Sequence, residues 1–228
     1  LLKVSNSLCN LFVQKKYSYN FNWLGSPVIQ NPSDLIVMQE LIFDLKPDLI
    51  VETGIARGGS LIFYASILKL SGNRGKVIGV DVDIRPHTRN LLNKHFLRKD
   101  IITFQGSSIS KEIFEKVKKF TKKRKKVLVC LDSLHTHDHV IEELNLYSTL
   151  VTKGSYLIVF DTISGIFDKK TMSIFKKHYR NKHFTKTRNP KSAVNLFLKK
   201  NKNFIVDELP YLKSLTSNNP GGFLKKIK

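Results

Sequence analysis

Four acidic residues each stand directly after a short apolar run of the sequence, and this shared placement points to chemistry. They are Glu52, Asp81, Asp132 and Asp161. Where apolar runs form parallel strands, their carboxyl ends meet at one edge of the sheet, and ligands bind in the crevice beyond that edge. We therefore expect these carboxylates to lie around a single site.

Two of the acids are candidate ligands for a divalent metal. The carboxylate oxygens of Asp132 and Asp161 suit Mg²⁺ or Mn²⁺, with water completing the coordination. A metal held there can bind a substrate hydroxyl and lower its pKa. His135 follows closely after Asp132 and is placed to accept the proton, so we predict Asp132 and His135 as catalytic residues.

A glycine-rich turn follows the first acid, in the sequence LIVETGIARGGS over residues 49–60. Gly54 and Gly58 allow the backbone to turn tightly and to approach a ligand closely. A phosphate-binding loop would have lysine where Ser60 stands, and a dinucleotide-binding loop would have glycine where Ala56 stands. An acid beside a turn without lysine favours a ligand with hydroxyls and positive charge over a triphosphate.

Two later turns offer further contacts with such a ligand. Asp81 ends the second apolar run, and an acid at the end of a second strand commonly holds ribose hydroxyls. Gly106, Ser107 and Ser108 follow the third run, where small residues with hydroxyls can accept a flat adenine ring. The same three residues also suit an ordinary helix cap.

The composition limits the class of protein. The 228 residues with 41% hydrophobic content suit one α/β domain with a substantial core. The sequence contains no run of 18 apolar residues, so it predicts no membrane span. The first residues lack the features of a secretion signal. With only Cys9 and Cys130, a disulfide framework is excluded, which predicts a reducing, cytoplasmic location.

The net charge of +21 predicts anionic partners. These include an acidic glycan or a phosphorylated glycolipid, the inner membrane face as a peripheral contact, and nucleic acid, which we do not favour. Lysines solvated on ordinary faces explain the same charge equally well.

Alternating periodicities predict strands and helices in turn. Five predicted strands lie at 48–52, 76–81, 101–105, 126–132 and 155–161. Predicted helices between and after them lie at 59–70, 86–96, 111–122, 138–151 and 189–201. Two closing strands are predicted at 204–207 and 222–227, as an antiparallel hairpin. This order predicts a three-layer, Rossmann-like α/β fold around a mostly parallel, seven-stranded sheet.

Two segments fall outside this alternation. Residues 1–30 are mixed and aromatic, and we predict a cover or lid over a single domain at 31–228. Residues 162–188 are polar and basic, and we predict a long loop there. Long loops in compact domains are usually functional.

The chain resembles the cephalosporin hydroxylase/rhamnosyl O-methyltransferase family. The matching segments run in family order from about residue 22: NWLGSPVIQNPSDL, PDLIVETGIARGGS, VIGVDVDIRPH, QGSS, LDSLHTHDHVIEELNLYSTLVTKGSYLIVFDT, NPKSAVNLFL and GGFLKKIK. The resemblance implies a class I methyltransferase fold that binds S-adenosylmethionine (SAM) and self-associates. It also implies Mg²⁺-assisted O-methylation of a sugar hydroxyl on a cell-surface glycan, lipopolysaccharide or glycolipid.

The resemblance also implies roles for individual residues. It assigns the methionine and sulfonium end of the cofactor to Glu52, Gly54, Gly58 and Ser60. Asp81 would hold the ribose, and Ser107 and Ser108 would lie near the adenine. The metal would again lie on Asp132 and Asp161, with His135 as the base.

One position departs from the pattern of the family. Some relatives have an acidic pair at the end of the fifth strand, and catechol-type enzymes have Asp-Asn. Here Phe160 precedes Asp161 and Thr162 follows it. The third protein ligand of the metal therefore stays open between Thr162, Asp138 and water alone.

Two other functions are each favoured by part of the sequence. The charge favours an RNA methyltransferase, but the sequence has no RNA-binding module or RNP-like aromatic motif. A noncatalytic basic binding protein on the same scaffold would not need all four acids. The run HTHDH at 135–139 is similar to part of a metallo-β-lactamase signature but is one residue short.

Overall fold

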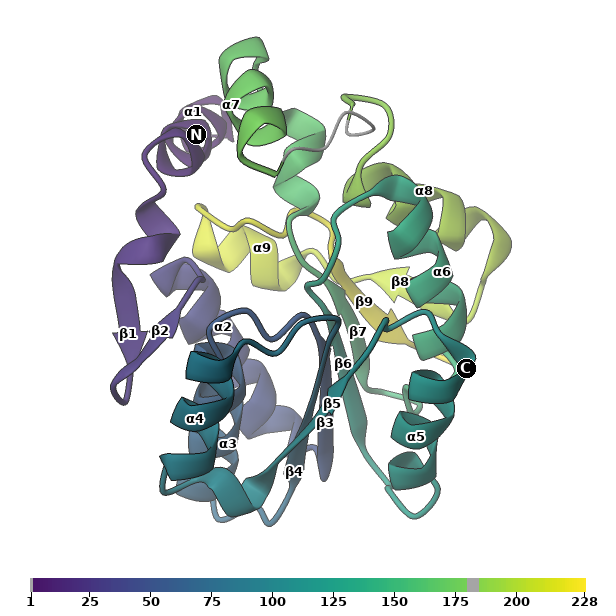
Figure 1. The fold of residues 1–228 in the computed structure, drawn as a ribbon. Helices are drawn as coiled ribbons and strands as arrows, with labels where there is room; N and C mark the ends of the chain where they lie inside the picture. The colour runs from purple at the N-terminus through teal and green to yellow at the C-terminus, as the bar shows by residue number, and fades with distance from the viewer. Residues whose placement is uncertain (1, 180–184) are drawn as a thin grey trace.

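The computed structural model describes residues 2–179 and 185–228, and a seven-stranded sheet forms its centre (Figure 1). The strand order is β5-β4-β3-β6-β7-β9-β8. The strands are β3 (Leu49–Thr53), β4 (Lys76–Asp81), β5 (Ile101–Gln105), β6 (Val127–Leu131), β7 (Tyr156–Val159), β8 (Phe204–Val206) and β9 (Phe223–Lys226). The first five are parallel, and β9 runs antiparallel to both β7 and β8. The predicted sheet with its antiparallel closing hairpin is confirmed.

Helices cover both faces of this sheet. One face carries α2 (Pro32–Leu45), α3 (Gly59–Leu70) and α4 (Pro86–Lys94). The other carries α5 (Lys111–Thr121), α6 (His137–Tyr147) and α8 (Pro190–Lys200). Polar side chains start several of them: Ser110 accepts a hydrogen bond from Ile113 N, and Asn189 and Ser192 form a capping box.

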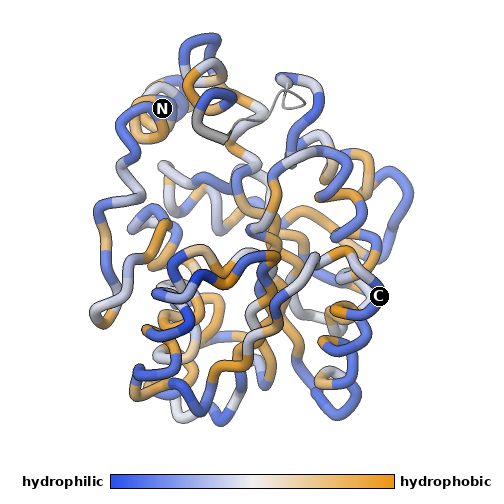
Figure 2. The backbone as a smooth tube through the Cα atoms, in the orientation of Figure 1, coloured by the Kyte–Doolittle hydropathy of each residue, from blue (hydrophilic) through white to orange (hydrophobic). Residues whose placement is uncertain are grey.

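The core follows from the alternation of side chains along the strands. Ile50 and Leu128 pack with α2 and α3, whereas Val51 and Val129 pack with α5, α6 and α8. All residues of β3, β6 and β7 are buried, because a parallel sheet between two helical layers has no solvent-facing side. Figure 2 shows this as apolar colour along the central strands.

The segment 162–188 differs from its prediction as a loop. It contains a 3₁₀ helix, η3 (Thr162–Ile166), and an α-helix, α7 (Lys169–Tyr179), so the prediction is wrong for these residues. The polar, basic composition favoured a loop, although Met172 and Phe175 stand three residues apart, as on one face of a helix. Phe167 and Phe175 pack against Cys9 of the N-terminal segment, which stabilises the helix through tertiary contact. Residues 180–184 of the predicted loop lie outside the described residues.

The N-terminal segment reaches over the carboxyl end of the sheet. It comprises α1 (Leu2–Gln14), η1 (Tyr17–Asn20) and an antiparallel hairpin of β1 (Phe21–Trp23) and β2 (Ser26–Val28). The Trp23 indole donates a hydrogen bond of 2.8 Å to Ser66 Oγ on α3 and packs edge-on against Phe63. These contacts hold the hairpin on α3, while α1 lies on α7 (Figure 1). The domain boundary at residue 30 stays a prediction.

A short helix, α9 (Leu209–Ser214), lies between β8 and β9. None of the helices described here combines the length and the apolar composition needed to cross a membrane.

Candidate active site

A pocket of about 600 Å³ lies at the carboxyl ends of the parallel strands. This volume is in the range of small-molecule sites. Its floor includes Asp81, Asp132 and Asp161. Asp81 is the last residue of β4, Asp132 directly follows β6, and Asp161 comes shortly after β7. Its roof comes from the N-terminal segment and from the segment of η3 and α7: Val13, Lys16, Ser18, Tyr19, Ile163, Phe167, Ile174 and Phe175.

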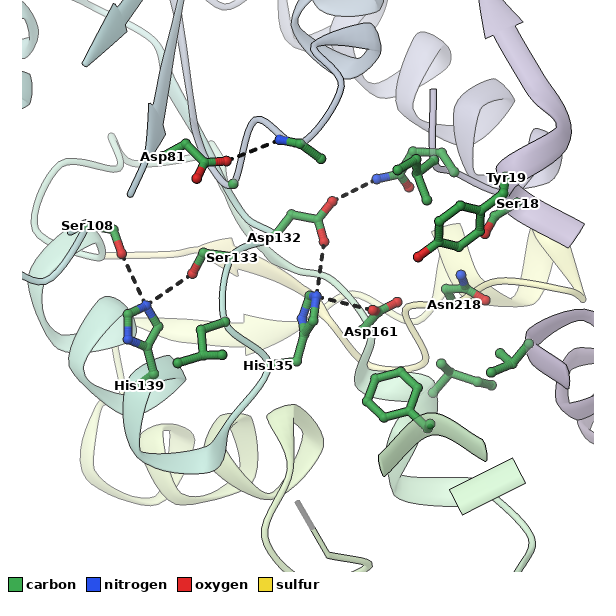
Figure 3. A pocket seen from close by; sticks show the side chains of 18 of the residues that line it. Ser18, Tyr19, Asp81, Ser108, Asp132, Ser133, His135, His139, Asp161 and Asn218 are labelled. Carbon is green, nitrogen blue, oxygen red and sulfur yellow. Dashed lines mark hydrogen bonds and ion pairs between the residues drawn. The ribbon is translucent and has the colours of Figure 1, made fainter. Parts of the chain in front are cut away.

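Asp132, His135 and Asp161 form a compact cluster in this pocket (Figure 3). One ligand atom from each lies within 4.8 Å of the others. His135 Nε2 is 3.3 Å from Asp161 Oδ2 and 3.9 Å from Asp132 Oδ1. The three side chains are between 12% and 22% exposed, so a ligand in the pocket can reach them.

The two residues that the sequence offers as a third protein ligand, Thr162 and Asp138, lie away from this cluster. The Thr162 hydroxyl is buried and donates a hydrogen bond of 3.1 Å to Pro220 O. Asp138 is largely exposed and forms an ion pair with Arg188. The imidazole of His135 is therefore the additional protein group that the fold brings to the two carboxylates.

The electrostatics of Asp132 favour a cation. Burial and the neighbouring charges of Asp161 and Glu52 raise the pKa of Asp132 well above its ordinary value. Gln30 opposes this shift by donating a hydrogen bond of 2.9 Å to Asp132 Oδ2. A divalent cation between the carboxylates would remove the repulsion that disfavours their ionised forms.

The backbone of Asp161 adopts an unusual conformation. Its φ of 55° lies in the left-handed region, which residues other than glycine rarely occupy. Its N–H donates to Asn219 Oδ1 at 3.0 Å, and Ser164 Oγ donates to its carbonyl oxygen at 2.7 Å. Strain of this kind is typical of functional positions, where surrounding contacts hold it in place.

Asp81 fixes the glycine-rich turn. Its Oδ2 accepts hydrogen bonds from the N–H groups of Ile55 at 2.7 Å and Ala56 at 3.1 Å, and its Oδ1 accepts from Asp83 N at 3.0 Å. A carboxylate can accept about four hydrogen bonds, so one position remains for a ligand hydroxyl. Its predicted role with ribose stays a prediction.

Gly54 is the point of closest approach between the turn and β6. It lines the pocket with φ of 90°, and an added Cβ would overlap the carbonyl oxygen of Asp132. Gly58, also at positive φ, starts α3 against the side chain of Leu92 and is not among the lining residues. Of these two predicted cofactor residues, the structure places only Gly54 on the pocket wall.

Glu52 and Ser60 also lie behind the pocket wall rather than on it. Ser60 Oγ donates to Glu52 Oε2 at 2.6 Å, and the Tyr64 hydroxyl donates to Oε1 at 3.1 Å. The Glu52 side chain is fully buried, which raises the pKa of its carboxyl to about 8. In this arrangement both residues support the turn from below, and their predicted cofactor contacts stay predictions.

We expect Glu52→Gln to stabilise the protein at neutral and alkaline pH. A folded pKa of about 8 against an ordinary value of 4.5 means that stability falls as pH rises between them, because the unfolded chain ionises first. The variant removes this penalty, on the order of 3 kcal/mol at pH 7, and keeps partners for Ser60 and Tyr64. Urea unfolding at several pH values from 4 to 9 gives the free energy of unfolding of both proteins. If this free energy changed with pH equally in both, the raised pKa of Glu52 would be contradicted.

A polar network joins the residues that follow β5 and β6 to α6 on one wall of the pocket. His139 Nε2 lies 3.2 Å from Ser108 Oγ and 3.1 Å from Ser133 Oγ, and Ser133 donates to buried Glu143 at 2.7 Å. Ser107 also lines the pocket here. The network orients the wall on which the sequence predicts the adenine.

Gly106, in contrast, forms the turn before this wall. With φ of 152° it lies against the side chain of Ile113 on α5 and is not among the lining residues.

The three histidines of the HTHDH run do not converge. His135 faces the two carboxylates, His137 Nδ1 lies 2.7 Å from Ser192 Oγ, and His139 joins the serine network. This divergence is incompatible with the metal site of a metallo-β-lactamase.

The sequence interpretation missed several residues of the site. Gln30 holds Asp132, and Asn218 lines the pocket from the loop before β9. Asn218 is itself positioned by buried Asp34, which accepts a hydrogen bond of 2.9 Å from Asn218 N. Gln30 stands in the segment NWLGSPVIQNPSDL, but nothing in its local pattern indicates a partner more than a hundred residues away.

Comparison with known sequences gives a family match. The family model Rhamnosyl O-methyltransferase/CmcI matches residues 15–227. A rhamnosyl O-methyltransferase of Mycobacterium leprae (strain TN) is 31% identical over 144 residues, which cover 61% of this chain and 59% of the relative. One of Mycobacterium bovis (strain BCG / Pasteur 1173P2) is 30% identical over 155 residues, covering 65% and 61%. The match thus spans about three fifths of the length of these relatives.

Solved structures share the fold. A CmcI structure with Mg and SAM has a TM-score of 0.62 at 19% identity, covering 92% of this chain and 78% of that chain. The MycE methyltransferase from the mycinamycin biosynthetic pathway, in complex with Mg and SAH, has a TM-score of 0.56 at 13% identity, covering 96% and 55%. At these identities the likeness concerns the fold.

Proposed function

The chain belongs to the rhamnosyl O-methyltransferase/CmcI family, as its sequence motifs predicted, and we propose that it transfers a methyl group from SAM to a sugar hydroxyl. The observation that carries this proposal is the cluster of Asp132, His135 and Asp161 on the floor of a ligand-sized pocket. Two carboxylates and an imidazole around one point can hold a cation and accept a proton, which is what activation of a hydroxyl requires.

The pocket fits SAM in size and charge. Its volume of about 600 Å³ accommodates a nucleoside with an amino acid side arm. The floor supplies three carboxylates toward a positively charged sulfonium, and Asp81 retains acceptor capacity for a hydroxyl. The polar wall of Ser107 and Ser108 suits the edge of a purine ring.

The donor set fits a divalent cation such as Mg²⁺ or Mn²⁺. Asp132 and Asp161 would hold it through carboxylate oxygens, and the raised pKa of Asp132 reflects burial together with repulsion from Asp161, which a cation relieves. SAM supplies the methyl group. The cation would bind the acceptor hydroxyl and lower its pKa.

The residues of the chain then position and deprotonate the acceptor. His135 Nε2, held near Asp161 Oδ2, is placed to take the proton of the acceptor hydroxyl. Gln30 fixes the carboxylate of Asp132, and the apolar side chains of Phe167 and Ile174 exclude water from above. Alignment of this kind is worth roughly 7–11 kcal/mol in favourable systems.

The family favours a sugar acceptor over RNA and over a noncatalytic binding role. The relatives carry the name rhamnosyl O-methyltransferase, which supports a glycan or glycolipid rather than RNA. The net charge of +21 supports an anionic acceptor. Two buried, free cysteines, Cys9 and Cys130, support work in a reducing cytoplasm.

Calorimetry with SAM, followed by a transfer assay, tests the proposal. We expect SAM to bind and a rhamnose-bearing glycan or glycolipid to become methylated, with EDTA abolishing transfer because Asp132 and Asp161 lose their cation. An excess of Mg²⁺ should restore activity after EDTA. Absence of SAM binding would refute the proposal as a whole, and turnover unchanged by EDTA would refute the metal.

A further inference from the structure

The amphipathic pattern of α1 is inverted relative to that of an ordinary surface helix. A helix on a folded domain normally turns its apolar stripe toward the core. The buried residues of α1 are instead Ser5, Cys9 and Asn10. Its exposed large apolar side chains are 37% to 69% exposed and are Leu2, Val4, Leu8 and Leu11.

Three of the exposed apolar residues lie on one face of α1. Val4, Leu8 and Leu11 recur at the four- and three-residue spacing that places side chains on one face of a helix. We call Val4, Leu8 and Leu11 the α1 stripe; Leu2, also exposed, lies on another face of the helix. An exposed apolar stripe of this kind marks a site of interaction.

Lysines are frequent on α1 and on the helix beside it. Lys3, Lys15 and Lys16 lie on or just after α1, and the adjoining α7 carries Lys169, Lys170, Lys176 and Lys177. Residues 1–20 contain no acid, and Asp168 is the one acid of residues 167–179. Figures 1 and 2 show α1 and α7 together at one end of the molecule, with apolar and hydrophilic residues alternating along both helices.

We propose that the α1 stripe and these lysines bind the surface of an anionic lipid bilayer. A helix with an apolar face and flanking lysines lies in the headgroup region, where the apolar side chains are buried and the ammonium groups meet anionic lipids. A second copy of the chain is the less favourable occupant. It also carries +21, and the same lysines would face each other across a dimer.

The position of the stripe relative to the pocket gives this contact a purpose. Val13 and Lys16 follow the stripe along the chain and line the roof of the pocket. A bilayer against α1 would therefore lie beside the pocket, where the sugar of a membrane-anchored acceptor can enter. Bilayer binding itself needs neither SAM nor turnover, so its test is independent of the proposed methyl transfer.

Sedimentation with vesicles tests the proposal. We expect the chain to sediment with vesicles of phosphatidylcholine containing about 30% phosphatidylglycerol, much less with phosphatidylcholine alone, and less in about 0.5 M NaCl. The double variant Leu8→Asp/Leu11→Asp should bind the anionic vesicles about tenfold more weakly or worse, since two apolar side chains no longer enter the bilayer.

Leu70→Asp is the matched control. Leu70 is 81% exposed and ends α3, at the opposite end of the sheet from α1. This variant should bind vesicles like the wild type, and circular dichroism should show all three proteins folded.

Three results would overturn the proposal. The first is wild-type protein that ignores anionic vesicles. The second is a double variant that binds anionic vesicles as the wild type does, which would show that binding depends on the overall positive charge and not on the α1 stripe. The third is a dimer in sedimentation equilibrium that the double variant abolishes while vesicles have no effect, which would make a second copy the occupant.

Discussion

Asp132→Asn is expected to lower kcat for methyl transfer by about a thousandfold. The substitution keeps the size of the side chain and can keep an acceptor for the Gln30 amide. It removes one of the two carboxylates around His135, and with it the negative charge that would hold a cation. Steady-state transfer to a sugar acceptor, with SAM at saturation, measures the effect.

The reason for so large an effect is the geometry of the cluster. Asp132, His135 and Asp161 present their ligand atoms within 4.8 Å of each other, so no other described carboxylate can take over from Asp132 without moving a strand end. Asp81, the other acid on the pocket floor, accepts hydrogen bonds from two backbone N–H groups of the glycine-rich turn and from the N–H of Asp83.

SAM binding and the free energy of unfolding of Asp132→Asn show whether the variant loses its chemistry or its fold. The variant should still bind SAM, and its free energy of unfolding should be unchanged or higher, because repulsion between Asp132 and Asp161 is removed. Asp83→Asn is the matched control: its side chain is 68% exposed, lies near the same pocket and should leave kcat within about twofold. Full activity of Asp132→Asn would remove that residue from the mechanism.

Gly54→Ala is expected to lower the free energy of unfolding by about 3–5 kcal/mol. Two independent causes add. The φ of 90° is costly for any residue with a Cβ, and that Cβ would overlap the carbonyl oxygen of Asp132. Since both partners are backbone at the ends of β3 and β6, relief requires the strand ends to separate.

Gly72→Ala isolates the first cause, the positive φ, so the difference between the two variants gives the second. Gly72 also has a positive φ, of 71°, but an added Cβ there meets nothing within 4 Å. Its variant should therefore lose only about 1 kcal/mol, the cost of the backbone conformation alone. Urea unfolding of both variants gives the comparison. Equal losses would show that the close approach of Gly54 to Asp132 carries no energy.

A Gly54→Ala protein that still folds should also lose activity. Moving the end of β6 shifts Asp132 relative to Asp161, and the cluster depends on both. We expect SAM binding and methyl transfer to fall together in this variant, whereas Asp132→Asn loses transfer alone.

Much of the fold was accessible from the sequence because its signals are local. The apolar runs before Glu52, Asp81, Asp132 and Asp161 set the strands, and the rule that parallel strands end at one edge placed the acids on one side. Three of the four line the pocket as expected. Glu52 does not, because Ser60 and Tyr64 draw its carboxylate into the core, and no periodicity reports such a partner.

The sequence by itself thus determined the order of the sheet strands and of most of the helices around them, the glycine turn and the family, all of which depend on neighbouring residues. Tertiary structure alone decided that Gln30 holds Asp132, that Asp34 positions Asn218 and that Phe175 packs on Cys9. Each of these depends on contacts between residues far apart in the chain. Such contacts form only when the sheet brings their elements together, so no short stretch of sequence can contain them.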